Sequence, residues 1–217
     1  MSGDVVDVKR LERHLYLPPT KPGIVDVPEM TFLAVDGEGD PNDSASYAEA
    51  IEILYGLAYT IKMSKKGDHQ PDGYVDFVVP PLEGLWCIDD PATAFDGLAL
   101  VDKEQLTWTS MLRVPAFVTD DVLAWAKERL GAKKRDLNLD RAYLHTYTEG
   151  LCTQIMHIGP YDTEPASVAL MDELAAAEGY VTDFENGRRH HEIYLSDPRR
   201  VAPEKMKTVV RHPIRPV

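Results

Sequence analysis

The stretch RRHHEIYLSDPRR, residues 188–200, decides how the rest of this sequence is interpreted. Its centre alternates polar and apolar side chains before a turn-forming Asp-Pro pair, a pattern typical of a half-buried β-strand. Because successive side chains of a strand point to opposite faces, Ile193 and Leu195 share one face. Glu192 and Tyr194 therefore share the other.

The mid-strand position of Glu192 leaves two interpretations open. A carboxylate beside an aromatic residue either faces solvent on an ordinary antiparallel sheet or lines a pocket, since an unpaired buried charge is costly. We expect Glu192 and Tyr194 to face a groove. We expect Ile193 and Leu195 to pack beneath long helices.

Residue patterns along the chain predict two halves with the same order of elements. Residues 1–22 predict an N-terminal lead-in with one short helix, which ends in a proline-rich segment. In the first half the patterns predict strands over 24–27 and 31–35 with Pro28-Glu29 between them, a long amphipathic helix over 44–65, and strands over 74–79 and 105–114. In the second half they predict strands over 141–148 and 151–158 joined by a hairpin at Glu149-Gly150, a helix over 165–178, and strands over 191–196 and 207–211.

The repeated order indicates an internal duplication. Two pairs of segments can be superimposed on one another, 32–37 on 154–159 and 74–81 on 190–197. We therefore predict an α+β fold in which duplicated ββαββ units, of the SHS2 type, form one curved antiparallel sheet. Two long helices would cover its convex face, and a ligand groove would occupy its concave face. Residues 23–217 would form a single domain of two pseudo-repeats, about 23–115 and 140–215, joined by a helix over about 119–131.

The superposition of the two halves places Asp76 where Glu192 lies, so that two carboxylates would enter one groove. Several aromatic residues lie on elements that could border it, and each of them also fits an ordinary core position. Together with a lone carboxylate they are typical of a cage for a flat or cationic ligand. The aromatic candidates are Tyr55, Trp86, Trp108, Tyr147 and Tyr194.

Composition limits the partners. The chain has 23 Lys and Arg against 36 Asp and Glu, a formal charge of −13, which disfavours nucleic acid and favours a cationic small molecule. We therefore expect no appreciable affinity for DNA at physiological salt. The two cysteines lack metal or redox spacing, the amino terminus lacks the apolar run of a signal peptide, and no apolar run is long enough to span a membrane. These features predict a cytoplasmic protein.

Motifs for a metal or an organic cofactor are missing from the sequence, so we predict neither. The seven histidines form no recognisable ligand set, because the adjacent His190 and His191 point to opposite faces of a strand. His145 and His157 approach each other across the predicted hairpin, but no third ligand is evident. Nucleophile elbows, phosphate-binding loops and dinucleotide fingerprints are also missing.

Three phrases resemble the GyrI-like small-molecule-binding proteins: PLEGLW over 81–86, EGLCTQIMHIGPYDTEP over 149–165, and HEIYLSDPRR over 191–200. The resemblance covers about residues 23–215 and is strongest to the free-standing branch that includes the cyclopropanoid cyclopropyl hydrolases. It implies the duplicated fold with a ligand groove. It also implies that Glu192 is the buried acidic residue of a multidrug-binding pocket ringed by aromatic residues.

Two functions follow from this resemblance. One is a hydrolase that opens cyclopropane rings in DNA-alkylating natural products, with Glu192 and Tyr147 as catalytic residues. The other is a protein that binds and sequesters small molecules without turnover. In both cases the expected ligand-binding residues are Tyr55, Trp86, Trp108, Tyr194, Asp76 and His157. Only some twenty residues precede the first predicted strand, too few for a three-helix DNA-reading domain, so a transcription factor is not expected.

Overall fold

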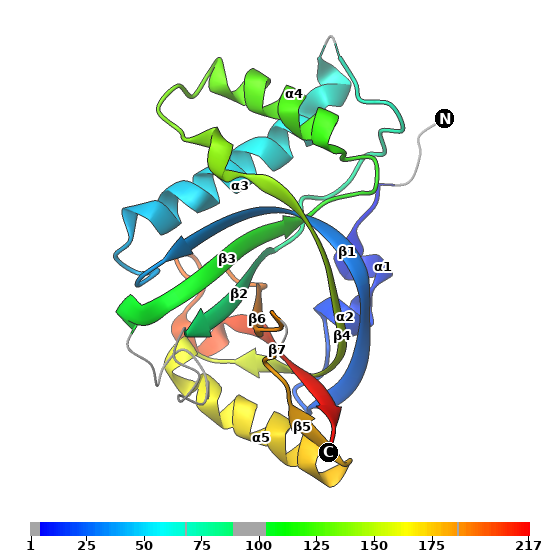
Figure 1. The fold of residues 1–217 in the computed structure, drawn as a ribbon, viewed down its shortest axis with the longest axis vertical. Coiled ribbons are helices and arrows are strands. Elements are labelled where there is room, and N and C mark those ends of the chain that lie inside the picture. The colour runs from blue at the N-terminus through cyan, green and yellow to red at the C-terminus, as the bar shows by residue number, and fades with distance from the viewer. Residues whose placement is uncertain (1–4, 68, 89–102, 186) are drawn as a thin grey trace.

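The fold is an antiparallel sheet that curls around an inner core of side chains, seen in a computed structural model that describes residues 5–67, 69–88, 103–185 and 187–217 (Figure 1). The helices are α1 (Val8–Leu11), α2 (Arg13–Tyr16), α3 (Ala45–Lys62), α4 (Asp120–Gly131) and α5 (Glu164–Ala177). The strands are β1 (Gly23–Glu38), β2 (Leu82–Ile88), β3 (Leu106–Arg113), β4 (Tyr143–Ile158), β5 (Tyr180–Thr182), β6 (His190–Tyr194) and β7 (Lys207–Pro216). The predicted α+β class, the antiparallel sheet and the two long helices are confirmed.

The sheet has 7 strands in the order β4-β1-β3-β2-β6-β7-β5. Because β4 pairs with β1 along most of its length and with β7 at its carboxyl end, the curled sheet meets itself. We call the enclosed side the inner face and the side that carries α3 and α5 the outer face. In Figure 1, α3 and α4 lie at one end of the outer face and α5 at the other.

The long strands β1 and β4 explain why the sequence predicted hairpins there. Each is a single strand of 16 residues, and the turn-like residues Pro28-Glu29 and Glu149-Gly150 mark a bend within it. Gly150 has a φ of 71°, which glycine tolerates without strain. The bend in β1 shifts the alternation of side chains by one residue. After the bend the even-numbered Met30 and Phe32 belong to the inner core, whereas before it the odd-numbered Val27 does. The predicted hairpins are therefore wrong, because the turn signals serve a bend.

The outer face carries the larger apolar core. Ser44 caps α3 by accepting a hydrogen bond from the backbone of Tyr47 at 3.2 Å, and the helix presents an apolar stripe to the sheet. Residues Ala50, Ile53, Leu54, Leu57, Ala58 and Ile61 of that stripe are buried. They pack with Trp86 and Trp108 from the strands and with the apolar side of α4.

The inner face is closed by α2, whose Leu15 and Tyr16 are buried against the sheet. Ile193 belongs to this inner core and Leu195 packs against it, whereas Tyr194 packs against the outer core. The alternation along β6 is therefore as predicted, but the faces are exchanged. The expectation that Ile193 and Leu195 pack beneath the long helices is wrong, because strand parity shows which residues share a face and not what covers it.

Two further predictions about the first half need correction. Residues 74–79 form no regular strand and make one isolated bridge, between Val6 and Phe77. The strand that lies beside β6 is β2, where Gly84 is paired with Glu192. The superposition of 74–81 on 190–197 is therefore wrong, because Pro80-Pro81 precedes this strand and does not end it.

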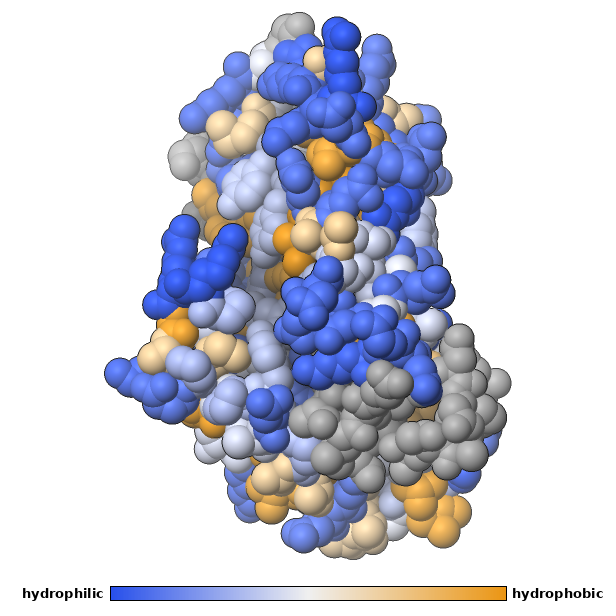
Figure 2. Space-filling model, turned by 90° about the vertical axis from the view of Figure 1, so that its left-hand side faces the viewer, coloured by the Kyte–Doolittle hydropathy of each residue, from blue (hydrophilic) through white to orange (hydrophobic). Residues whose placement is uncertain are grey.

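Hydrophilic residues predominate on the side of the molecule shown in Figure 2, where hydrophobic residues occur in small separate groups. Among the described residues, no helix combines the length and the apolar character needed to cross a membrane.

Candidate functional site

A cleft of about 660 Å³ opens on the outer face, with α3 on one side and the segment that leads into α5 on the other. Its floor comes from β2 and β6. This volume lies in the range of small-molecule sites. We call it the outer cleft, and the residues that matter for its chemistry are Tyr47, Tyr55, Trp86, Tyr161, Glu192 and Tyr194.

The aromatic rings of the outer cleft hold one another in place. The indole N–H of Trp86 donates a hydrogen bond to the Tyr194 hydroxyl at 2.9 Å. Tyr161 meets Tyr194 edge to face with 6.1 Å between ring centroids, and Tyr47 meets Trp108 in the same way at 4.9 Å. Such contacts add to the stability that buried ring area provides. The walls are therefore largely formed before any ligand arrives.

Three phenol groups keep their protons in this environment. Burial, and secondly the negative charge of Glu192, raises the pKa of Tyr47 to about 12. The same two causes, in the same order, raise the pKa of Tyr161 and of Tyr194. All three hydroxyls are thus available as hydrogen-bond donors at neutral pH.

Gly84 leaves room for the contact between Trp86 and Tyr194. A Cβ atom at this position would lie 2.6 Å from the Trp86 Nε1 atom and 3.1 Å from the Tyr194 hydroxyl. We predict that Gly84→Ala displaces both rings and weakens ligand binding about tenfold, while unfolding becomes about 1–3 kcal/mol easier. Ligand titration and urea unfolding check this, and wild-type affinity in Gly84→Ala would show that the paired rings do not shape the site.

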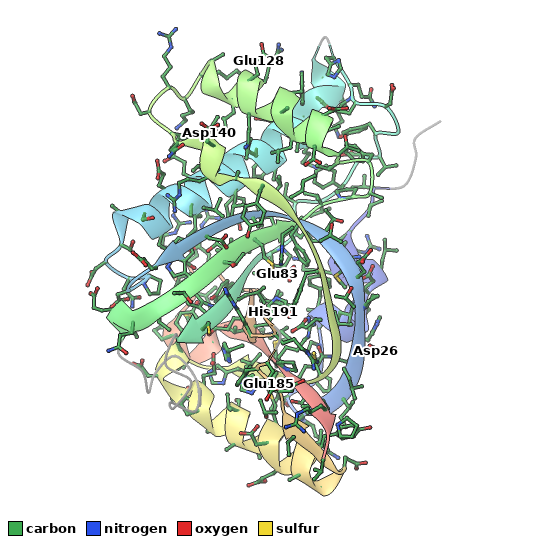
Figure 3. The ribbon with its side chains drawn as sticks, in the orientation of Figure 1. Asp26, Glu83, Glu128, Asp140, Glu185 and His191 are labelled. Carbon is green, nitrogen blue, oxygen red and sulfur yellow. The ribbon has the colours of Figure 1, made fainter. Side chains whose placement is uncertain are left out.

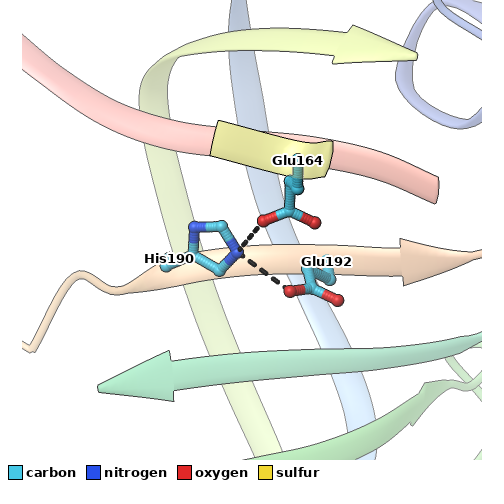
Figure 4. Close-up of side chains that lie close together, drawn as sticks. All are labelled: Glu164, His190 and Glu192. Atoms are coloured by element: carbon cyan, nitrogen blue, oxygen red, sulfur yellow. Dashed lines mark hydrogen bonds and ion pairs between the residues drawn. The ribbon is translucent and has the colours of Figure 1, made fainter. Parts of the chain in front are cut away.

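Glu192 belongs to a buried cluster with Glu164 and His190, shown in Figure 4. The His190 Nε2 atom lies 3.1 Å from a Glu192 oxygen and 3.3 Å from a Glu164 oxygen. The exposed fractions of Glu164, His190 and Glu192 are 0%, 1% and 0%. Glu164 is the first residue of α5, where the helix N-terminus favours a negative charge. We call these three residues the carboxylate–histidine cluster.

The protonation state of the cluster follows from its contacts. Burial alone would lower the pKa of His190, but hydrogen bonds to Glu164 and Glu192 outweigh it and raise this pKa to about 9. Burial, and secondly the charge of Glu164, raises the pKa of Glu192. Burial, and secondly the charge of His190, lowers the pKa of His212. His190 is therefore an imidazolium, and its Nδ1–H donates to the neutral His212 at 2.7 Å.

The ligand atoms of the cluster lie within 4.8 Å of one another, a spacing that would also suit a metal ion. A metal would need the lone pair of His190 Nε2 and would displace the proton that both carboxylates contact. The imidazolium thus supplies the positive charge between the two carboxylates. We assign the cluster to proton chemistry.

The raised pKa of His190 makes stability depend on pH. Since the folded protein binds the proton more tightly than the unfolded chain, this stabilisation is complete below about pH 6.5 and is lost as pH rises through about 9. The buried His191, whose pKa is also raised, acts in the same direction. We predict a falling melting temperature between these pH values and a smaller fall in Glu164→Gln. A melting temperature independent of pH would contradict the assigned charge of His190.

A second buried network occupies the inner face, where Figure 3 shows Glu83 and His191 between the curled strands. His191 Nδ1 lies 3.0 Å from Glu149, and its Nε2 lies 3.0 Å from Glu83. Arg211 donates to Glu149 at 2.8 Å, and Tyr16 donates to Glu83 at 3.1 Å. The two carboxylates here contact Arg211 and His191. Although burial acts to lower the pKa of His191, the charge of Glu149 and the hydrogen bonds to Glu149 and Glu83 outweigh it and raise this pKa. The network ties α2 to the sheet.

The structure brings together four of the predicted site residues: Glu192, Tyr194, Trp86 and Tyr55 all line the outer cleft. Trp108 lies behind Tyr47 in the outer core with an exposed fraction of 1%. It supports the cleft wall and does not line the cleft.

The other three predicted site residues lie elsewhere. Tyr147 is on the inner face, where it lines a separate cleft of about 800 Å³ and stacks on His145 with 5.5 Å between centroids. Asp76 forms ion pairs with Lys62 at 3.4 Å and Lys65 at 2.5 Å. The expectation that Tyr147 and Asp76 share a groove with Glu192 is wrong, because it depended on the misassigned hairpin and strand.

His157 is buried away from the outer cleft. Its Nδ1 atom lies 2.9 Å from the Ser167 hydroxyl on α5, and its Nε2 atom lies 3.1 Å from the Pro160 carbonyl oxygen. These bonds fix the turn that leads into α5. They assign His157 a structural position, and its expected contact with ligand has no geometric support.

The sequence interpretation missed Tyr47, Tyr161 and Glu164. Tyr47 lies on the predicted long helix, but its apolar spacing made it look like core. Tyr161 and Glu164 lie in the phrase PYDTEP over 160–165, where an acidic residue before a proline is typical of a helix start. The acidic residue before a proline predicts the start of the helix, but it does not predict that Glu164 contacts His190.

Comparisons with known proteins identify one family and several similar structures. Residues 20–215 match the family described as GyrI-like small molecule binding domain. No curated protein matches the chain. A hydrolase from Listeria innocua is 47% identical, with a TM-score of 0.88 over 97% of this chain and 100% of that one. An uncharacterized conserved protein from Listeria innocua is 48% identical, with a TM-score of 0.90 and the same coverage.

A more distant structure shares the fold alone. The C-terminal domain of EcmrR is 11% identical, with a TM-score of 0.52 over 91% of this chain and 98% of that one. The family match spans nearly all of the described residues, including both walls of the outer cleft. The chain therefore belongs to the GyrI-like small-molecule-binding domain family.

Proposed function

We propose that this protein binds flat aromatic or cationic xenobiotics in the outer cleft and opens strained cyclopropane rings in DNA-alkylating natural products by adding water. The observation that carries the proposal is the position of Glu192. This fully buried carboxylate lines an aromatic cleft, and among the described residues its Oε2 atom has no hydrogen-bond partner. A buried acceptor without a donor is costly unless a ligand or water completes it.

The aromatic walls suit a flat ligand. Trp86, Tyr47 and Tyr161 offer ring faces and edges, and the negative charge below them favours a ligand with positive or electron-poor character. The resemblance to the cyclopropanoid cyclopropyl hydrolases and the description of a 47% identical Listeria innocua protein as a hydrolase both support turnover.

The proposed reaction needs little machinery, because a cyclopropane conjugated to a dienone is already activated. Glu192 takes a proton from water, and the water oxygen forms a bond to the ring CH₂ carbon. The strained C–C bond breaks, and its electron pair moves into the dienone, whose oxygen becomes a phenolate. The proton held by Glu192 then goes to the phenolate, so that water has been added overall.

Hydroxyl donors can stabilise the developing phenolate. Tyr194 is the best placed, because it lines the outer cleft, its oxygen accepts the Trp86 N–H, and its raised pKa keeps its own proton on the hydroxyl. Tyr47 and Tyr161 are further donors in the same cleft. Tyr147 takes no part in this mechanism, since it lies on the inner face.

Sequestration without turnover is the alternative function. It requires only the aromatic walls and the charge of Glu192. Both functions place the protein where an alkylating compound threatens DNA, so a cytoplasmic location is part of the proposal. Nucleic acid itself is not a proposed partner, because the formal charge of −13 would repel phosphates.

The test compares binding with turnover. Aromatic cations and cyclopropane-bearing alkylators are first screened for binding by thermal shift. Each alkylator is then incubated with a substoichiometric amount of protein, and the masses of its products are determined by mass spectrometry. A product that is heavier than the alkylator by the mass of one water, formed in molar excess over the protein, supports the hydrolase function. A bound but unchanged alkylator supports sequestration, and the absence of any ligand would refute both.

A further inference from the structure

The carboxylate–histidine cluster has one more negative than positive charge when both carboxylates are ionised. Glu164 and Glu192 approach the same nitrogen of His190, at 3.3 Å and 3.1 Å. All three side chains are almost completely buried, so solvent does little to screen the excess charge.

Within the part of the chain that the structure describes, the groups in contact with Glu164 and Glu192 include no second cation. The groups that act on Glu192 come from four segments. They are His190 and Tyr194 on β6, Glu164 at the start of α5, Tyr161 just before α5, and Tyr47 on α3. His212 on β7 contacts His190 as a neutral acceptor. Among the described residues, Glu164 Oε2 and Glu192 Oε2 have no hydrogen-bond partner.

We propose that Glu164 and Glu192 share one exchangeable proton beside the His190 imidazolium, and that a cationic ligand in the outer cleft replaces this proton. Two carboxylates around one cation have room for one further positive charge, because like charges so close cannot both stay ionised without it. Glu192 lines the outer cleft, whereas Glu164 does not. Glu164 is therefore a positioning residue that acts on the ligand through His190 and Glu192.

This exchange links binding to pH. Since a cation and a proton compete for the same charge, the affinity for a cation rises as pH rises, and each binding event releases a proton. A neutral ligand leaves the proton in place, and its affinity stays independent of pH. The cleft would thus accept both classes of ligand, with pH setting its preference.

The inference rests on the proposed function only in that the outer cleft must bind ligand, and turnover is not required. The probes are N-methylquinolinium, a permanent cation, and quinoline, which has a similar shape and is uncharged at neutral pH. Calorimetric titration in two buffers with different ionisation enthalpies counts the protons exchanged. We expect the release of about one proton per bound N-methylquinolinium and of none for quinoline.

Glu164→Gln removes the excess charge while keeping the shape of the side chain. In this variant we expect proton release to disappear and the affinity for N-methylquinolinium to fall about tenfold or more, with quinoline unaffected. Glu173→Gln is the matched control, because Glu173 lies exposed on the same helix. Glu164→Asp keeps the charge and should restore proton release.

The outcomes separate the inference from the proposed function. Binding of N-methylquinolinium by the wild type without proton release would overturn the shared proton and leave the outer cleft as the ligand site. Failure of both probes to bind would count against the proposed function itself. The wild-type proton count decides the inference even where Glu164→Gln does not fold.

Discussion

Glu192→Gln is expected to fold normally, to bind aromatic cations more weakly by about 1.5–3 kcal/mol, and to turn over a cyclopropane substrate about a hundredfold more slowly or worse. Glutamine preserves the shape of the side chain and removes its charge and basicity. The binding loss reflects a missing hydrogen bond to a charged group. The slower turnover reflects a missing general base. Titration calorimetry and initial rates measure the two effects.

The stability of Glu192→Gln should equal or exceed that of the wild type at neutral pH. A carboxylate with a raised pKa binds its proton more tightly in the folded state, so its contribution to stability falls as pH rises above about 4.5. Glutamine removes this cost. His190 keeps Glu164 as its partner, which preserves the buried imidazolium.

Control variants test whether Glu192 lies in the ligand site. Glu173→Gln, on the exposed side of α5, should behave as the wild type. Trp86→Ala should lose ligand because it removes the floor of the outer cleft. We would abandon the site if Glu192→Gln melted far below the wild type, or if both Glu192→Gln and Trp86→Ala handled every active ligand normally.

The second large effect concerns the inner network. Arg211→Met is expected to lower the free energy of unfolding by about 3–5 kcal/mol, the usual cost of breaking a buried ion pair. Arg211 donates to Glu149 at 2.8 Å, to the Leu15 carbonyl at 2.9 Å and to Gln154 at 3.1 Å. Its loss leaves Glu149 with His191 alone. Urea unfolding measures the change.

The dependence of the free energy of unfolding on pH, in the acid range, provides a second readout for Arg211→Met. Although burial raises the pKa of Glu149, the charges of His191 and Arg211 outweigh it and lower this pKa to about 2. The ionised Glu149 thus stabilises the fold above about pH 4.5, and this stabilisation is lost as pH falls through about 2. Arg211→Met should lose part of it. The double variant Glu149→Gln/Arg211→Met should recover stability, because no buried charge is left without its partner. Equal stability of wild type and Arg211→Met would show that the network contributes nothing.

Local patterns predicted the elements whose signals arise within one segment. The helical spacing and Ser44 cap predicted α3, and the alternation of residues 191–195 predicted which side chains of β6 share a face. The elements that cover each face of β6 are determined by contacts between segments far apart in the sequence, which local patterns do not predict. Leu15 and Tyr16 of α2 reach Ile193 across nearly the whole chain, and nothing near Ile193 in sequence signals them.

The predicted hairpins that misplaced Tyr147 have a physical cause. Pro28 and Gly150 are turn residues, and a bend inside a long strand uses the same backbone conformations as a turn that ends it. The sequence therefore predicted hairpins, and Tyr147 was placed beside Glu192. Tyr147 lies on the inner face in the continuous strand β4, and Glu192 of β6 lines the cleft on the outer face.

The position of a bound ligand tests the central claim most directly, because the outer cleft and the cleft beside Tyr147 have no lining residue in common. A crystal structure with N-methylquinolinium should show its ring in the outer cleft, against Trp86 and Tyr161, with its charge directed toward Glu192. Density in the inner cleft beside Tyr143 and Tyr147, with the outer cleft empty, would contradict the account.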